Sequence, residues 1–324
     1  MRTVNMLEAK STLSRLVEAV ESGAETEIII ARNGRPGPVL IEIPGDMWNV
    51  EVPGEINYKP TKRMVSAPDH KAVDAAAAAL ISAKRPMLYV GQGVHWAEAY
   101  GELKELAELL AIPVCTSLEG KSCFDETHPL SLGSGGRAYP KAVRSFLDRS
   151  DVILGIGCSF TETNFGISMP AGKTIIHATL DPAHLNKDVK ISYGLVGDAK
   201  LTLAGLVAAC KAAGATPRDA APVAAEIKPM ADAWLQEWMP KLTSNEAPLN
   251  PYRVLWDLQN TVDKANTIIT HDAGSPRDQL SPFWKTTAPH TYIGWGKTTQ
   301  LGYGLGLAMG AKLACPDKLC INVW

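Results

Sequence analysis

The chain has 324 residues, of which 46% are hydrophobic and 20% charged, and its formal net charge at pH 7 is −2. This length allows two domains and a short additional module, and the composition is typical of a soluble globular protein. The near-neutral charge argues against a general nucleic-acid-binding or membrane surface, and it leaves room for a local basic patch. No signal peptide or apolar run of membrane-spanning length is visible, so we expect a cytoplasmic protein without a membrane partner.

Residues 1–36 form a segment with a pattern of its own. Asn5 followed by Glu8 is a capping box and predicts a helix, and a strand at 27–31 with an Asn33-Gly34 turn predicts a hairpin. This strand–helix–hairpin resembles the N-terminal part of the prevent-host-death class of antitoxins. The resemblance implies a dimer whose N-terminal end contacts operator DNA. The residues nearest the DNA would be Arg2, Thr3 and Asn5.

The resemblance to antitoxins stops at Pro36. Residues 37–46, GPVLIEIPGD, are similar instead to the close of the pyrimidine-binding domain of thiamine-diphosphate enzymes. We therefore expect Pro36 to join two unrelated pieces, with residues 37–66 as the end of a lost domain and a proline-rich linker. Lys10 and Arg15 on the predicted helix are available for phosphates, and a solvated helix face is the alternative.

Residues 67–207 alternate strands with helices. Strands are predicted at 86–90, 112–116, 152–156 and 174–179, and helices at 69–84, 97–110 and 141–148. This alternation, with glycine or Asp-Pro at strand ends, predicts a doubly wound parallel sheet, a Rossmann-like α/β domain. His177 lies within the last strand and is interpreted as a hydrogen-bonded core residue. Residues 208–248, rich in alanine and proline, are expected to be a linker, and the tryptophans near its end are expected in the core or a subunit interface.

This block is similar along its whole length to the central domain of thiamine-diphosphate enzymes of the acetolactate synthase and oxalyl-CoA decarboxylase type. The matching landmarks are Gly91-Gln92-Gly93, Gly133 to Gly136, residues 151–157 and Leu180-Asp181-Pro182. Some members hold FAD or an adenine nucleotide here. The corresponding candidates in this chain are Gly133, Ser134, Gly135, Gly136 and Asp181. Members with FAD show an acidic pair and an arginine where this chain has Thr161-Glu162-Thr163, which argues against FAD or ADP and for a purely structural domain.

The last segment, 249–324, predicts a second α/β domain. An apolar strand at 267–270 leads into a polar loop, a glycine-spaced stretch leads into a helix at 305–314, and a further strand begins at Leu319. In open α/β sheets, ligands bind beyond the carboxyl ends of the strands, and glycines let backbone N–H groups approach a phosphate. The alternative is that these glycines only let a helix pack closely on the sheet.

The order of motifs in this segment resembles the first half of the diphosphate-binding domain of the same enzymes. The motifs are Asp272-Ala273-Gly274, Gly294-Trp295-Gly296, residues 300–305 and Gly310-Ala311-Lys312. The resemblance implies that the loop after the first strand lies by the cofactor diphosphate, and that Leu301 supports the cofactor rings. The implied contacts are Asp272, Gly274, Ser275, Thr299, Gln300, Leu301 and Gly302. His271, next to this loop, is a further candidate.

The same resemblance implies thiamine diphosphate with Mg²⁺ as cofactors, and also shows what the sequence does not contain. The family's magnesium motif would start where Trp324 ends the sequence, and no residue matches the catalytic glutamate. We therefore expect a truncated second domain, and a fragment of a lyase or synthase acting on 2-oxo acids or acyl-CoA that is inactive alone. A homo-oligomer or a partner chain would supply the pyrimidine-binding domain. The alternatives are an antitoxin-like DNA-binding head on an inert α/β body, and a non-functional fusion.

The chemistry-bearing residues show no other motif. The six cysteines form no Cys-x-x-Cys pair and have no companion histidine at metal-ligand spacing. We expect them to be free thiols, mostly buried, in a reducing compartment. No metal site formed by protein side chains is predicted, and no catalytic residue is assigned within the chain.

Overall fold

The structure is a computed structural model that describes residues 2–5, 28–32, 35–36, 64–294 and 300–324. The chain divides into two compact units, Met1–Met64 and Val65–Trp324. In the first unit, β1 (Arg2–Asn5) pairs in parallel with β2 (Ile28–Arg32), which pairs antiparallel with β3 (Arg35–Pro36). The β2–β3 pairing confirms the predicted hairpin. The predicted helix with Lys10 and Arg15, and the junction after Pro36, lie outside the described residues.

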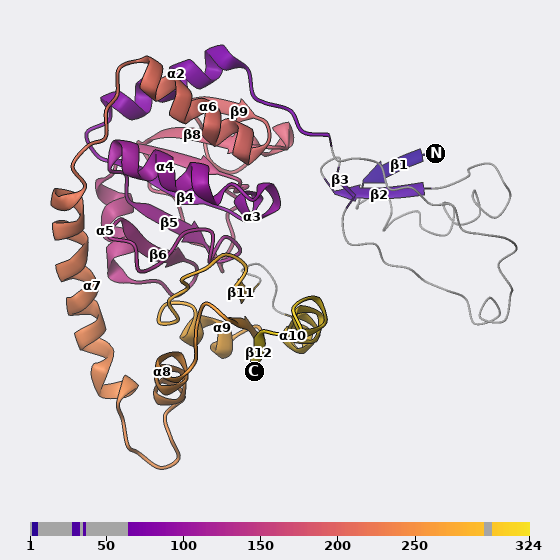
Figure 1. Cartoon of the computed structure of the whole chain (residues 1–324), viewed down its shortest axis with the longest axis vertical. Helices are drawn as coiled ribbons and strands as arrows, with labels where there is room; N and C mark the ends of the chain where they lie inside the picture. The colour runs from indigo at the N-terminus through magenta and orange to yellow at the C-terminus, as the bar shows by residue number, and fades with distance from the viewer. Residues whose placement is uncertain (1, 6–27, 33–34, 37–63, 295–299) are drawn as a thin grey trace, which may run out of the picture. The chain divides into compact units, whose positions relative to one another are not determined.

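The second unit contains a six-stranded, fully parallel sheet in the order β6-β5-β4-β7-β8-β9 (Figure 1). Its strands are β4 (Pro86–Val90), β5 (Val114–Ser117), β6 (Ser131–Gly135), β7 (Val152–Ile156), β8 (Thr174–Thr179) and β9 (Tyr193–Val196). Numbered along the chain, this order reads 3-2-1-4-5-6, the arrangement of a doubly wound Rossmann fold. The predicted fold class of this domain is therefore confirmed.

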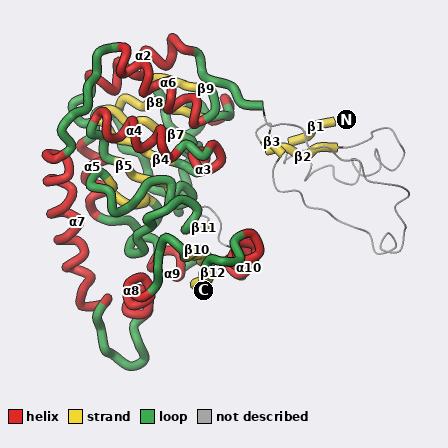
Figure 2. The backbone as a smooth tube through the Cα atoms, viewed as in Figure 1, coloured by secondary structure: helices red, strands yellow, loops and turns green. Residues whose placement is uncertain are grey.

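Helices cover both faces of this sheet, and Figure 2 shows them in red around its yellow strands. On one face, α2 (His70–Ser82), α4 (Tyr100–Leu110) and α6 (Ala199–Ala212) pack against Leu88 and Val90 of β4. On the other face, α5 (Lys141–Arg149) packs against Met87 and Tyr89 of the same strand. Alternate residues of one strand thus enter two hydrophobic cores, because successive side chains of a strand point to opposite faces.

The structure has two helices in this region, and the predicted helix at 97–110 corresponds to the second of them. The first, α3 (Gly93–Ala97), ends at Glu98, whose φ of 50° places it in the left-handed conformation typical of a helix end. The second, α4, begins at Tyr100. The sequence analysis does not predict α3 or the break after it, although Gly101 lies two residues beyond the break.

Residues 208–248, predicted to be a linker, contain a long helix instead, because alanine favours a helix and Pro222 lies in its first turn, where no N–H donor is needed. This helix, α7 (Ala221–Leu242), runs from α5 of the central domain down to α8 (Pro251–Thr261) (Figure 1). Trp234 stacks on Phe283 with ring centroids 4.9 Å apart, and Trp238 packs on Tyr252 at 5.0 Å. The tryptophans predicted in a core or interface therefore pack within this chain.

The C-terminal segment forms a second parallel sheet of three strands, in the order β11-β10-β12. Its strands are β10 (Thr267–His271), β11 (Tyr292–Ile293) and β12 (Leu319–Val323), and its remaining helices are α9 (Ser275–Leu280) and α10 (Tyr303–Ala314). The buried Leu118, in the loop after β5, packs into the core of this sheet with Ile269 and Trp284. The two sheets therefore share a hydrophobic contact within one compact unit.

Four cysteines are buried free thiols, as predicted, and Cys315 and Cys320 are partly exposed. His177 is fully buried in β8, and its Nε2 lies 3.0 Å from the carbonyl oxygen of Cys158, which confirms the interpretation of a hydrogen-bonded core histidine. Among the described residues, none of the helices combines the length and the apolar character needed to cross a membrane.

Candidate functional site

The loop after β10 is organised by Asp272. This residue is nearly buried, and its own N–H donates to the carbonyl of Val323, 2.8 Å away, which extends the pairing of β10 with β12. One carboxylate oxygen accepts from the N–H of Ala273 at 2.9 Å, and the other accepts from the N–H of Gly302 at 2.7 Å. Asp272 therefore ties the start of α10 to the end of β10. Its direct contact with a cofactor stays a prediction.

Gly274 and Ser275 follow at the start of α9. Gly274 has a φ of 83° and a ψ of −137°, a conformation that a residue with a side chain rarely adopts. A Cβ built on Gly274 would meet no atom within 4 Å beyond its chain neighbours, so the backbone here faces open space. A ligand group can therefore approach the main chain at this point.

Leu301 lies just before the start of α10. Its side chain is 76% exposed, although it is a large apolar residue. Gln300 and Gly302 beside it are also exposed, and Thr299 lies outside the described residues. The exposure of Leu301 fits a residue whose apolar surface is covered by a bound group and not by the chain itself.

Gly274, Ser275 and Leu301 line a single pocket of about 360 Å³ together with Ala273. The structure thus brings together three of the residues predicted as cofactor contacts. The remaining lining residues come from other parts of the unit. They are Arg137 after β6, Phe165 in the segment after β7, and Arg277 and Asp278 of α9.

Sequence reasoning did not identify Arg137, Phe165 or Arg277 as site residues. Arg277 is almost fully buried; its Nε donates to Asp278 at 2.8 Å, and its guanidinium lies 5.1 Å from the ring centroid of Phe165. The sequence offered one signal, the position of Arg137 directly after the Gly133–Gly136 run. No local pattern showed that Phe165 would meet Arg277, because that contact depends on how the two sheets pack.

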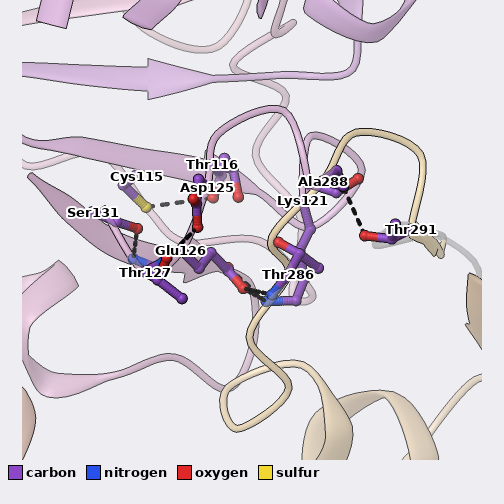
Figure 3. Close-up of polar contacts among 12 residues, drawn as sticks. Cys115, Thr116, Lys121, Asp125, Glu126, Thr127, Ser131, Thr286, Ala288 and Thr291 are labelled. Atoms are coloured by element: carbon purple, nitrogen blue, oxygen red, sulfur yellow. Dashed lines mark hydrogen bonds and ion pairs between the residues drawn. The ribbon is translucent and has the colours of Figure 1, made fainter. Parts of the chain in front are cut away.

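A buried ion pair of the central domain lies where that domain meets the segment that carries this pocket (Figure 3). The Lys121 ammonium lies 2.6 Å from both carboxylate oxygens of Glu126, and both side chains are almost completely buried. The N–H of Glu126 donates to the carbonyl of Thr286 at 2.9 Å, and the Thr286 N–H donates back to the Glu126 carboxylate at 2.9 Å. Lys121 also lies 5.4 Å from the ring centroid of Tyr292 in β11.

The candidate nucleotide residues are not brought together in the same way. Gly133 to Gly135 lie in β6, at one edge of the sheet, and Gly136 follows. Asp181 follows β8, and three strands separate β8 from β6. The carboxylate of Asp181 accepts from the N–H of Ala183 at 2.9 Å and so caps a short 3₁₀ turn. Nucleotide binding at these residues stays a prediction.

His271 is fully buried at the end of β10. Its Nδ1 lies 2.9 Å from the carbonyl oxygen of Asp272, and its Nε2 has no hydrogen-bond partner among the described residues. A Cβ on Gly294 would overlap the imidazole ring, so glycine at 294 makes room for it. Burial lowers the pKa of His271 to about 4, which keeps the ring neutral at pH 7.

Stability is expected to fall as the pH drops from about 6.5 towards 4. In that window the unfolded chain binds a proton on His271, whose ordinary pKa is 6.5, and the folded chain does not, so acid favours unfolding. We expect this residue to account for about 2 kcal/mol of the difference between pH 7 and pH 5. Urea unfolding of the native chain and of His271→Gln at both pH values measures it. Equal pH dependence in the two proteins would contradict the assignment.

Comparison with known proteins identifies the family. Residues 73–206 match the model of the thiamine pyrophosphate enzyme central domain, and residues 272–324 match the model of the thiamine pyrophosphate enzyme C-terminal TPP binding domain. The two matches together cover more than half of the chain, and they include the six-stranded sheet and the pocket loops. The chain belongs to the thiamine pyrophosphate enzyme family.

Within that family, the chain is similar to acetolactate synthase large subunits. A probable large subunit from Methanocaldococcus jannaschii is 35% identical over 317 residues, which cover 91% of this chain and 51% of the relative. The large subunit from Corynebacterium glutamicum is 33% identical over 314 residues, covering 91% and 47%. This chain spans about half the length of these relatives.

A solved structure shows the same fold. The benzoylformate decarboxylase from Polynucleobacter necessarius superposes with a TM-score of 0.63 at 20% identity, covering 86% of this chain and 50% of that one. The predicted membership in the thiamine-diphosphate enzymes is confirmed by the family models. The resemblance of residues 1–36 to antitoxins stays a prediction, as does DNA contact by Arg2, Thr3 and Asn5 in β1.

Proposed function

We propose that residues 65–324 form the central domain and the diphosphate-side wall of a thiamine-diphosphate site in an acetolactate synthase-like enzyme acting on 2-oxo acids or acyl-CoA. The observation that carries this proposal is the pocket that Gly274, Ser275 and Leu301 line together. The similarity to acetolactate synthase large subunits supports the subclass.

The residues of the pocket fit the two ends of this cofactor. The open backbone at Gly274 and the neighbouring Ser275 suit a diphosphate group, and the exposed Leu301 suits the apolar faces of the rings. Thiamine diphosphate, when bound, supplies an electron sink for carbanion chemistry at a carbonyl carbon. The chain's own contribution is positional, because Asp272 holds the N–H of Gly302 and so keeps Leu301 at the rim of the pocket.

We further propose that a second polypeptide completes the cleft, either another copy of this chain or a partner that carries a pyrimidine-binding domain. A row of exposed apolar residues supports this proposal. The row consists of Leu301, which lies just before α10, and of Leu305, Met309 and Leu313, which follow at intervals of four residues along α10. The second polypeptide would also provide the acid–base glutamate, and Mg²⁺ would accompany the diphosphate through carboxylate oxygens that no motif of this sequence provides.

Calorimetric titration of the purified chain with thiamine diphosphate tests the proposed site. We expect a Kd of about 0.1–1 mM, or about −4 to −5.5 kcal/mol, because the chain offers one wall of the site. Thiamine, which lacks the diphosphate, serves as the matched ligand and is expected to bind at least about tenfold more weakly. We also expect no turnover of pyruvate or oxalyl-CoA by residues 1–324 alone. The absence of any heat at millimolar thiamine diphosphate would reject the site, and measurable decarboxylation would reject the inactivity.

The alternative function, an operator-binding head, is supported by the sequence pattern of residues 1–36 alone. The described part of that segment is the small sheet of β1, β2 and β3. Operator binding therefore stays a prediction beside the proposed cofactor function.

A further inference from the structure

We propose that His95, Tyr100 and His290 form an acid-sensitive latch between the central domain and the loop that leads into β11. His95 belongs to α3 and Tyr100 begins α4, whereas His290 lies between α9 and β11. The Tyr100 hydroxyl oxygen lies 3.0 Å from Nδ1 of His95 and 2.7 Å from Nε2 of His290. One phenol thus connects two imidazoles, and the latch holds the loop before an edge strand of the C-terminal sheet.

The three rings of the latch also pack on one another. The ring centroids of His95 and His290 are 4.8 Å apart, and both histidines lie within 6 Å of Tyr100, at 5.7 and 5.9 Å. The backbone of His290 has a φ of 58°, a left-handed conformation that is uncommon for a residue with a side chain. The ring contacts and the hydrogen bond to Tyr100 compensate for this unfavourable conformation. A loop released from the latch therefore has more relaxed conformations available to it.

The hydrogen bonds of the latch require one arrangement of protons when both histidines are neutral. Nε2 of His95 lies 3.0 Å from the carbonyl oxygen of Lys121, which only accepts, so this nitrogen carries the proton. Nδ1 of His95 then accepts from the Tyr100 hydroxyl, whose oxygen accepts from Nε2 of His290. The Ser122 hydroxyl, 3.5 Å from Nε2 of His95, is too distant to change this order. Each hydrogen bond of the neutral latch therefore has one donor and one acceptor.

Two added protons do not fit this arrangement. If both histidines were charged, the Tyr100 oxygen would face two N–H donors, and its own hydrogen would have no acceptor among the three side chains. Two positive rings would also stand beside each other. Burial lowers the pKa of His95 to about 4, and it also lowers the pKa of His290. Because the ordinary histidine pKa is 6.5, an opened latch binds protons that the closed latch excludes, and acid favours opening.

The other ionisable groups that face the latch come from α3, the loop after β5 and the turn before β12. They are Glu98, Lys121, Cys123 and Lys318. Glu98 raises the pKa of His290 and Lys318 lowers it, so these two charges act in opposite directions. The ammonium of Lys121 is already paired with a buried carboxylate, and burial raises the pKa of Tyr100. The two histidines are therefore the groups of the latch that respond to acid between pH 7 and pH 5.

Hydrogen–deuterium exchange of the full chain at pH 7 and pH 5 tests the latch. Peptides that cover residues 286–293 report on the loop, peptides of β7 report on global unfolding, and protection factors correct each rate for the intrinsic effect of pH. We expect protection of 286–293 to fall at least about tenfold more than that of β7 at pH 5, because the shifted pKa of His95 alone favours the open form by this much.

Three variants assign the effect to the latch. His95→Gln keeps a donor for the Lys121 carbonyl and removes the titrating ring, so we expect it to lose most of the pH dependence at 286–293. It leaves His271 in place, and the contribution of that residue is therefore unchanged. Tyr100→Phe removes the hydroxyl that connects the two histidines, and we expect low protection of 286–293 already at pH 7. His70→Gln, at the exposed start of α2, is the matched control and is expected to behave as the native chain.

Equal loss of protection in 286–293 and in β7 would overturn the latch, because acid would then unfold the whole unit. The same pH dependence in His95→Gln as in the native chain would also overturn it, as would an equal loss of that dependence in His70→Gln. Circular dichroism and thermal unfolding at pH 7 show whether His95→Gln is folded. Tyr100→Phe gives an independent test, and native protection of 286–293 at both pH values in this variant would contradict the latch. None of these measurements requires a cofactor, so their outcome does not depend on the proposed function.

Discussion

Replacing Lys121 by methionine is expected to lower the free energy of unfolding by about 3–5 kcal/mol. Methionine fills a similar volume without a charge, so Glu126 would be left as a buried carboxylate without its cation. The side chains of Lys121 and Glu126 are only 2% and 4% exposed, and no solvent can compensate for the lost partner. Burial lowers the pKa of Lys121, and the Glu126 carboxylate opposes that shift. The charge on the lysine is therefore stabilised by Glu126, just as the carboxylate is stabilised by the lysine.

The double variant Lys121→Met with Glu126→Gln is the control for this prediction. It removes both charges and keeps an oxygen that can accept from the N–H of Thr286. We expect it to recover most of the lost stability, because a buried pair costs desolvation energy that an uncharged pair does not. Urea unfolding of the four proteins in the cycle measures the coupling. A Lys121→Met variant within about 1 kcal/mol of the native chain would show that the pair does not hold the two sheets together.

The ion pair also has a consequence for the pocket. Glu126 follows β5, and its partner Thr286 lies between α9 and β11, so their bonds join the part of the chain that carries Arg137 to the part that carries Gly274. Loss of this connection is expected to weaken thiamine diphosphate binding in Lys121→Met, although Lys121 does not line the pocket. The stability of the domain contact is thus linked to the geometry of the proposed cofactor pocket.

The sequence predicted the central sheet better than its edges. The bounds of β4, β7 and β8 are those predicted, because each is a mainly apolar run of strand length, PMLYV, VILGI and TIIHAT. The edge strand β6, with the sequence SLGSG, carries no such pattern and is a strand because it pairs with β5. The break between α3 and α4, at Glu98 and Ala99, is likewise not predicted.

The candidate site was likewise predicted only in part from the sequence. The family resemblance pointed to Gly274, Ser275 and Leu301, which all belong to the C-terminal segment. The structure places them in one pocket. It also pointed to Asp272, whose two carboxylate oxygens are taken by backbone donors. Arg137 lies more than a hundred residues earlier in the chain, and its approach to the pocket follows from the packing of the two sheets. Such a contact has no periodic or local signature from which it could be predicted.

The sequence left two explanations open for the glycines of α10. They let the helix pack closely on the sheet, or they let the backbone approach a phosphate. A Cβ on Gly304 would overlap Asn322 and would lie 2.7 Å from the carbonyl oxygen of His271. The Thr270 hydroxyl also donates to the carbonyl oxygen of Gly304 at 3.0 Å, so a hydrogen bond joins α10 to β10 at this contact. Gly310, on the same helix, is exposed and has no atom within 4 Å of such a Cβ. Close packing therefore explains Gly304 and does not explain Gly310.

Substituting Gly304 by alanine is accordingly expected to destabilise the C-terminal sheet by about 3 kcal/mol, because the backbone of β10 cannot move aside without breaking its pairing with β12. Gly310→Ala is the matched control on the same helix, and it is expected to add about 0.5–1 kcal/mol, the difference between the helix propensities of alanine and glycine. Amide hydrogen exchange of residues 267–271, with urea unfolding of both variants, measures the two effects locally and globally. If the two alanines changed stability in the same direction, α10 would not be held against β10 at Gly304, and the position of Leu301 at the rim of the pocket would need another cause.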